Sequence, residues 1–252
     1  MDSRPAPAVD LSDSALLALP VPRADAPSHL LPDAPHASLT RSYLDALLGG
    51  DRRRASALIL DAVAASVPVK DIYLHVFQRA QYEVGRLWQV QEISVAQEHY
   101  CTAATQLIMS QLYPHIFAVE NTGGTLLATC VSGDLHEIGV RMVADFFEMD
   151  GWNTFYLGAN TPNADVVGAL IDRQADVLAI SATISTHVRA VSTLIESVRA
   201  NEQCRAVKIL VGGYPFVVAP ELWRKIGADG SAGDAQAAIV LANHLRGRGI
   251  AS

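Results

Sequence analysis

The sequence predicts an α/β protein in which an antiparallel four-helix bundle precedes a doubly wound, five-stranded parallel sheet. Apolar residues recur with a helical period between residues 38 and 117. From residue 125 onwards, short apolar runs alternate with amphipathic segments, which is typical of strands that alternate with helices. We therefore expect a helical-bundle domain at 38–117, a polar linker at 118–124 and an α/β domain at 125–252.

Composition excludes several classes of protein. Half of the 252 residues are hydrophobic, which is enough for two cores, yet no apolar run approaches the ~18 residues that span a bilayer. The formal charge of −7 argues against a free-standing nucleic-acid-binding protein, which usually has a basic face. The three cysteines indicate neither a disulfide framework nor a Cys-only zinc site. With no signal segment at the N-terminus, these features predict a cytoplasmic protein that does not associate with membranes.

The first 37 residues differ from the rest of the chain. They hold seven of the twelve prolines, and proline restricts the residue before it and lacks a backbone donor. We expect a disordered leader at 1–37 with one short helix over 11–19, whose leucines offer an alternative role in docking a partner.

Capping and stop residues mark the helices of the bundle. Gly49 ends the first helix and Asp51 caps the second. Pro68 suits the first position of the third helix, and Ser94 with Gln97 forms a capping box at the fourth. Because the connections are short, consecutive helices are expected to run antiparallel.

Four short apolar runs predict strands of a buried parallel sheet: 126–131, 154–157, 177–180 and 208–211. Helical segments are expected between and after them, at 140–149, 164–173, 188–200, 220–226 and 235–245. The fifth strand of the sheet is not located by this pattern. A doubly wound, flavodoxin-like sheet of this kind binds its ligand at the carboxyl ends of its strands.

The loop after the first strand carries the first candidate site residues. It contains neither a G-x-G-x-x-G nor a G-x-x-x-x-G-K-[ST] motif, which removes the commonest nucleotide-binding functions of this fold. Asp134 precedes His136 by two residues and can accept a hydrogen bond from one imidazole nitrogen, which makes the other nitrogen a better metal ligand. Gly139 lets the backbone approach a bulky ligand closely.

Two further strand ends complete a spaced pattern. After Gly139 come 41 residues and then Ser181-Ala182-Thr183; after Thr183 come 28 residues and then Gly212-Gly213. The three segments follow three strands and so lie at one edge of the sheet. This set resembles the cobalamin-binding domain pattern D-x-H-x-x-G, S-x-L, G-G, with Thr183 in place of the usual leucine.

The resemblance implies a set of roles. In that family the base of the corrinoid's nucleotide tail leaves cobalt and enters the domain. His136 would then be the lower axial ligand of cobalt, and Asp134 would orient its ring. Ser181 would bond the buried base, and Gly212-Gly213 would leave room for the tail. The implied cofactor is adenosylcobalamin, with methylcobalamin and hydroxocobalamin as alternatives.

The helical half carries a second motif. Trp88 is followed by nine residues and then by Glu98-His99, at a tight corner between two predicted helices. This segment looks like the W-x9-E-H lid of the cobalamin-dependent photoreceptors of the CarH and LitR type. The resemblance implies that the three side chains face the upper side of the cofactor, with Trp88 over the adenosyl group. Gln89 stands where many of those photoreceptors have a histidine, so we do not expect capture of cobalt by a second histidine there.

The combination indicates a light sensor without a DNA-binding domain. No helix-turn-helix pattern is present, and the organisation resembles the AerR/PpaA antirepressors. That resemblance implies regulation of transcription, of photosynthesis-type genes, through a separate DNA-binding repressor, without direct nucleic-acid binding or enzyme activity. Two alternatives stay open: a corrinoid protein that carries methyl groups for methyltransferases, and a redox sensor that binds haem through His136. The sequence does not fix the oligomeric state, although bundle lids of this kind can offer an interface between copies.

Overall fold

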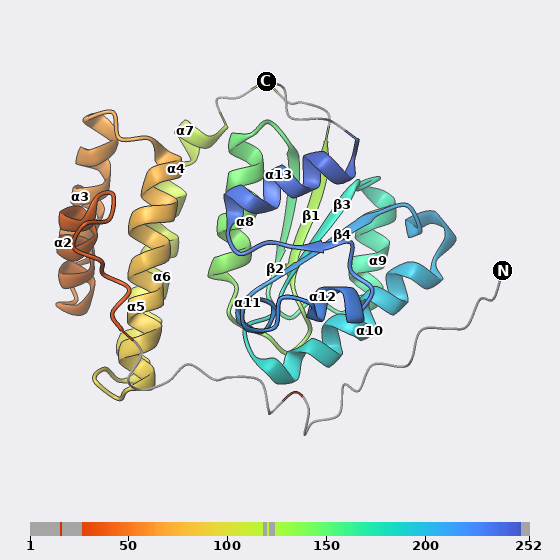
Figure 1. Ribbon diagram of the computed structural model, residues 1–252. Helices are drawn as coiled ribbons and strands as arrows, with labels where there is room; N and C mark the ends of the chain where they lie inside the picture. Colours follow the sequence, from red (N-terminus) through yellow and green to blue (C-terminus); the bar gives the residue numbers. More distant parts are fainter. Residues whose placement is uncertain (1–15, 17–26, 118–119, 121–123, 248–252) are drawn as a thin grey trace. The chain divides into compact units, whose positions relative to one another are not determined.

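The structure is a computed structural model that describes residues 16, 27–117, 120 and 124–247 (Figure 1). These residues form two compact units, a helical unit that ends at Glu120 and an α/β unit that contains the sheet. Most of the predicted leader, including the helix expected at 11–19, lies outside the described residues. Within 1–37 the structure describes residues 27–37 and Leu16, whose side chain is 3% exposed and belongs to the hydrophobic core of the α/β unit.

The helical unit confirms the predicted four-helix bundle. Its elements are α2 (Ala37–Leu48), α3 (Arg52–Ala64), α4 (Val69–Asp71), η1 (Ile72–Phe77), α5 (Gln78–Gln89), α6 (Val95–Gln111) and α7 (Tyr113–Ile116). The segments α4, η1 and α5 run on as one long third helix. The capping box of Ser94 and Gln97 is present, and Asp51 accepts a hydrogen bond from the backbone N–H of Arg54. Pro68 lies at the N-cap of α4, one residue before the position we expected.

The middle of the third helix is π-helical, which the apolar pattern does not predict. The wider turn of η1 lets Ile72, Tyr73, Val76 and Phe77 all be buried. Nearby, the Tyr43 hydroxyl and the Thr105 hydroxyl are hydrogen-bonded at 2.9 Å inside the bundle, which ties α2 to α6. The core of this unit is therefore aromatic and has its buried polar atoms paired at this point.

The sheet of the α/β unit has the strand order β2-β1-β3-β4-β5, and all pairs are parallel. The strands are β1 (Thr125–Cys130), β2 (Asn153–Gly158), β3 (Val177–Ser181), β4 (Lys208–Gly212) and β5 (Gly230–Ser231). This is the flavodoxin-like order of a doubly wound sheet. The four predicted strands are confirmed within one or two residues. The fifth has only two residues, too few to leave an apolar run in the sequence.

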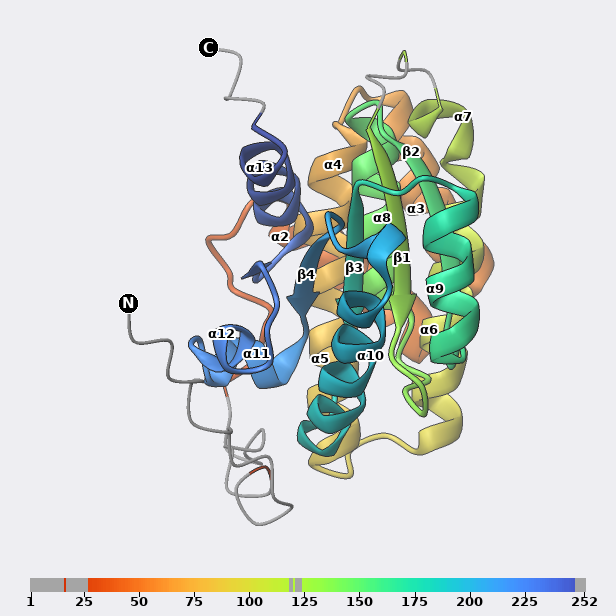
Figure 2. The same ribbon diagram turned by 90° about the vertical axis from the view of Figure 1, so that its right-hand side faces the viewer.

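Helices cover both faces of the sheet (Figure 2). One face carries α8 (Ile138–Met149) and α13 (Ala235–Leu245), which contact each other, and the opposite face carries α9 (Asn163–Asp172) and α10 (Val188–Ala200). The short elements η2 (Ser185–His187), η3 (Glu202–Cys204), α11 (Tyr214–Val218) and α12 (Leu222–Lys225) complete the unit. Buried side chains of β1, β3 and β4 form the core between these layers. No described helix is long and apolar enough to cross a membrane.

Candidate functional site

Strand register brings the predicted site loops to one edge of the sheet. Cys130, the last residue of β1, pairs with Ser181 at the end of β3, and Ser181 pairs with Gly212 at the end of β4. The three loops that follow therefore leave the sheet side by side. The backbone confirms this contact, because the N–H of Val131 donates to the carbonyl of Ser181 and the N–H of Ala182 donates to the carbonyl of Gly212.

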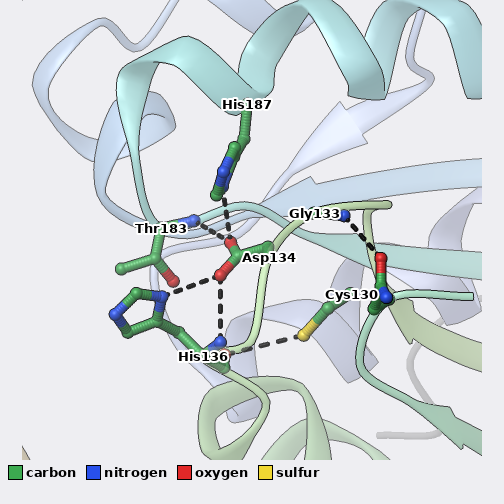
Figure 3. Close-up of polar contacts among 7 residues, drawn as sticks. Cys130, Gly133, Asp134, His136, Thr183 and His187 are labelled. Atoms are coloured by element: carbon green, nitrogen blue, oxygen red, sulfur yellow. Dashed lines mark hydrogen bonds and ion pairs between the residues drawn. The ribbon is translucent and has the colours of Figure 1, made fainter.

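Asp134 is the centre of this edge (Figure 3). Its side chain is fully buried. Its Oδ1 accepts from the backbone N–H of His136 at 2.9 Å and lies 2.8 Å from the ring Nδ1 of the same residue. Its Oδ2 accepts from the backbone N–H of Thr183 at 2.6 Å. The carboxylate thus joins the loop after β1 to the loop after β3.

These partners keep Asp134 ionised. Burial acts to raise the pKa of its carboxyl group, but the hydrogen bonds from His136 and Thr183 outweigh burial and hold the pKa at about 2. A carboxylate only accepts hydrogen bonds, so Nδ1 of His136 carries the proton and Nε2 is the nitrogen suited to bind a metal. The ring is half-exposed, at 51%. The geometry therefore presents one oriented imidazole at the sheet edge.

His187 is a site residue that the sequence analysis missed. Its Nδ1 lies 3.3 Å from Oδ2 of Asp134, and the side chain is 20% exposed (Figure 3). This nitrogen is buried and makes no well-aligned hydrogen bond. Its position in the sequence could have indicated this role, because it follows Thr183 by four residues and lies at the start of the helix after β3. Helices that begin at the carboxyl edge of a parallel sheet point their first residues toward the ligand site.

The glycines of the motif have different roles. Gly213 has a φ of 104°, and a Cβ on it would lie 2.0 Å from the carbonyl oxygen of Ala182, so the close packing of two loops requires glycine there. A Cβ on Gly212 would make only an ordinary contact with the Ala232 carbonyl, at 3.4 Å. A Cβ on Gly139 would meet nothing within 4 Å, so open space adjoins the first turn of α8.

Exposed apolar side chains come from the same edge. Leu135 is 73% exposed, Ile184 is 45% exposed and Val217 is 56% exposed. They follow β1, β3 and β4 respectively, and large exposed apolar groups gathered on one edge are typical of a binding surface. A macrocycle whose metal takes a single protein ligand fits this edge of the sheet. The edge offers one oriented imidazole, open space beside Gly139 and the three exposed apolar side chains.

The predicted lid residues belong to the helical unit. Trp88 lies in the last turn of α5 and is 44% exposed. Glu98 lies in the first turn of α6 and His99 follows it, and the Nδ1 of His99 is paired with a carboxylate oxygen of Glu98. The other carboxylate oxygen accepts from the Thr102 hydroxyl at 3.0 Å. The structure thus places the three residues on either side of one helix corner and pairs two of them.

A helical unit followed by a flavodoxin-like sheet, with an oriented imidazole at the carboxyl ends of its strands, defines a class of α/β proteins that bind a ligand at this edge of the sheet. Residues 124–241 match a family model described as a B12 binding domain, and residues 39–113 match a second model with the same description. Both units of the chain therefore match B12 binding domains, which supports cobalamin as the cofactor.

Individual relatives agree with this assignment. The chain is 27% identical over 217 residues to a corrinoid protein of Desulfitobacterium hafniense (strain Y51), an alignment that covers 84% of this chain and 99% of that protein. It is 30% identical over 121 residues to the HTH-type transcriptional repressor CarA of Myxococcus xanthus, which covers 48% of this chain and 41% of CarA. The solved Methanosarcina barkeri monomethylamine corrinoid protein is 25% identical, with a TM-score of 0.72 and coverage of 82% and 99% respectively. That match confirms the predicted fold class.

Proposed function

We propose that this protein is a cobalamin-dependent light sensor that regulates transcription through a separate DNA-binding repressor, as an antirepressor. The observation that carries the proposal is the corner between α5 and α6, where Trp88 precedes Glu98 and His99 in the pattern of the photoreceptor lid. An indole that is 44% exposed leaves a large apolar surface in water, which a bound ligand would cover.

The α/β unit supplies the residues that would hold the cofactor. His136 binds cobalt through Nε2, and Asp134 keeps the proton on Nδ1 and the ring in one orientation. Ser181, at the end of β3, bonds the base of the nucleotide tail, while Gly212 and Gly213 border the tail at the end of β4. When bound, an alkylcobalamin supplies a cobalt–carbon bond that visible light breaks.

The lid residues convert this change into a signal. Trp88 would cover the upper group of the bound cofactor, and the pair of Glu98 and His99 holds the corner that carries the indole. A tenfold change in partner affinity requires about 1.4 kcal/mol. At about 25 cal/mol per Å², that corresponds to covering or exposing ~60 Å² of apolar surface, less than one face of an indole ring.

The similarity to CarA supports a role in transcription, since that relative is named as a transcriptional repressor. The acidic balance of this chain, −7, suits contact with another protein better than contact with DNA. The partner we propose is therefore a DNA-binding repressor, and the chain itself is not an enzyme.

A light-difference experiment tests the sensor. The purified protein is loaded with adenosylcobalamin in darkness, freed of excess cofactor and exposed to green light, with the free cofactor as the control. We expect a new absorption spectrum that stays with the protein during gel filtration, and a change in hydrogen exchange within residues 84–99. If the spectrum of the bound cofactor and the exchange of this segment are the same before and after light, the sensor proposal is wrong.

Methyl transfer is the second candidate, and the similarity to the monomethylamine corrinoid protein favours it. In that role the chain would carry a methyl group on cobalt between methyltransferases, without catalysing the transfer. The test loads the protein with isotopically labelled methylcobalamin and measures, in darkness, enzyme-dependent loss of the label to a thiol acceptor. Turnover in the dark together with no light response would replace the sensor by the carrier. A pigment assay for haem separates the haem-binding redox sensor from both.

A further inference from the structure

A short segment before α2 lies against α5 in the helical unit (Figure 1). The backbone N–H of His29 donates to Oε2 of Glu83 at 2.8 Å, and the rings of His29 and Tyr82 lie 5.4 Å apart. The hydroxyl of Ser28 is also hydrogen-bonded to Glu83. We call residues 27–31 the strap. No motif of the sequence analysis includes them, and the proposed function gives them no role.

Glu83 is a buried carboxylate at the centre of these contacts, and it is only 4% exposed. Its Oε1 accepts from Nε and Nη2 of Arg86 at 3.0 and 2.7 Å, and its Oε2 accepts from the strap. Burial acts to raise the pKa of Glu83, but the hydrogen bonds from Arg86 and from the strap outweigh burial and hold the pKa below its usual value. The charged carboxylate therefore joins two parts of the chain, the end of α5 and the strap.

The strap itself lies on the surface. Residues 27–29 are exposed, Leu30 is partly buried and Leu31 is 54% exposed. A surface segment with little buried apolar area opens at a lower free energy than the core of its domain does. The strap is held chiefly by polar contacts to a single side chain, so its docked state depends on the position and charge of Glu83.

Arg86 connects the strap to the lid. It lies in the last turn of α5, two residues before Trp88. The backbone carbonyl of Arg86 accepts from the N–H of Val90 at 3.0 Å, and the carbonyl of Trp88 accepts from the N–H of Gln91 at 3.0 Å. The turn that carries the indole is thus the turn that positions the guanidinium. A shift of this turn would move both groups and disturb the pair of Arg86 and Glu83.

We propose that the strap is a releasable element whose docking on Glu83 is coupled to the state of Trp88. The inference rests on one part of the proposed function, the contact of Trp88 with the bound cofactor. That contact fixes the last turn of α5 and so favours the docked strap, whereas an indole without it leaves this turn freer and favours release. The strap thus transmits the state of the site to the surface of the helical unit, where a partner can bind it.

Thermodynamic linkage makes this coupling measurable from two sides. If the bound cofactor favours the docked strap by some factor, the docked strap favours cofactor binding by the same factor. Couplings between two sites commonly reach fivefold or more, and we expect about fivefold or more here. Two independent measurements must therefore give one number.

The backbone amide of His29 reports docking directly, because its acceptor is Glu83 only while the strap is docked. Protein labelled with ¹⁵N-histidine is studied by nuclear magnetic resonance, and His29→Ala identifies the signal. Hydrogen exchange of this amide is measured without cofactor, with adenosylcobalamin in darkness and after green light. We expect exchange about fivefold or more slower in the dark complex than without cofactor, and faster again after light.

Two substitutions at one position separate the backbone contact from the ring. His29→Pro removes the N–H that donates to Glu83, and His29→Ala keeps this N–H but removes the ring that lies against Tyr82. We expect His29→Pro to bind adenosylcobalamin less tightly than His29→Ala, by about the factor that hydrogen exchange gives. Should His29→Pro not fold, as judged by circular dichroism, Ser28→Ala is compared with the unsubstituted protein by the same criterion.

The outcomes distinguish the strap from the sensor. If adenosylcobalamin does not bind, the cofactor assignment is wrong and the inference falls with it. If it binds but light changes neither its spectrum nor the exchange of residues 84–99, the sensor is wrong, and the comparison in darkness still decides the strap. If exchange of the His29 amide is the same with and without cofactor, or if His29→Pro binds as tightly as His29→Ala, only the strap inference is wrong.

Discussion

Oδ1 of Asp134 contacts His136 twice, through the backbone N–H at 2.9 Å and through the ring Nδ1 at 2.8 Å. Two residues separated by a single position thus form a closed loop of hydrogen bonds that sets the ring orientation. The imidazole is arranged before any ligand binds, so binding does not have to spend free energy on ordering it.

The acid stability of the protein should depend on Asp134. Its pKa of about 2 lies below the ordinary value of 3.8, so the carboxylate stabilises the fold fully above about pH 5, and this contribution is lost as pH falls through 3.8 and 2. The loss is on the order of 2 kcal/mol. Urea unfolding of the cofactor-free protein between pH 5 and pH 2 measures it. In Asp134→Asn the free energy of unfolding should depend less on pH in this range. A pH dependence equal to that of the unsubstituted protein would contradict the prediction.

Removing the imidazole of His136 should weaken cofactor binding. His136→Ala leaves cobalt without its protein ligand, so we expect at least ~10-fold lower affinity and a changed absorption spectrum. His244→Ala, in the last turn of α13, is the control and should leave both unchanged. If His136→Ala binds cobalamin with the affinity and spectrum of the unsubstituted protein, the site is assigned wrongly.

Gly139→Ala should stabilise the cofactor-free protein and weaken cobalamin binding. A Cβ at this helical position meets nothing within 4 Å, and alanine favours a helix over glycine by ~0.5–1 kcal/mol. The added methyl group would instead occupy space that we assign to the cofactor. Gly168→Ala on α9 also meets open space and provides the matched control, with raised stability and unchanged affinity. Equal affinity in the two variants would show that the cofactor does not approach Gly139.

Gly213→Ala should destabilise the α/β unit strongly. The substitution combines a φ of 104° with a Cβ placed 2.0 Å from the Ala182 carbonyl oxygen, and we expect a loss of more than ~2 kcal/mol. Gly133→Ala has a similar φ of 86° but no atom within 4 Å, so its loss should stay near ~1 kcal/mol. Thermal or urea unfolding measures both, and a smaller loss at Gly213 than at Gly133 would refute the argument from close packing.

Trp88→Ala should separate light sensing from folding. Its side chain is 44% exposed, so we expect a stability change below ~1 kcal/mol, whereas Trp152→Ala removes a side chain that is 2% exposed and should cost ~3–5 kcal/mol. Trp88→Ala should keep the histidine-bound spectrum and lose the light-dependent change in hydrogen exchange. A full light response in this variant would remove Trp88 from the proposed mechanism.

Much of the fold was predictable from apolar periodicity. Buried parallel strands are continuous apolar runs, so four strands and the helix over Ala235–Leu245 were located correctly. Two features were not predicted from the sequence, each for a physical reason. The strand β5 is too short to form an apolar run, and the π-helical turn of η1 changes the period in the middle of a helix.

Local spacing by itself determined the pair of Asp134 and His136, because residues two apart in one loop meet whatever the rest of the chain does. It also determined that three loops would share one edge, since parallel strands end on the same side. Only the tertiary structure decided that the backbone N–H of Thr183, 49 residues further along the chain, donates to the carboxylate of Asp134. It also decided that His187 lies close to the same carboxylate. Such contacts depend on the register between β1 and β3, which no periodicity encodes, because it is set by how whole strands and helices pack.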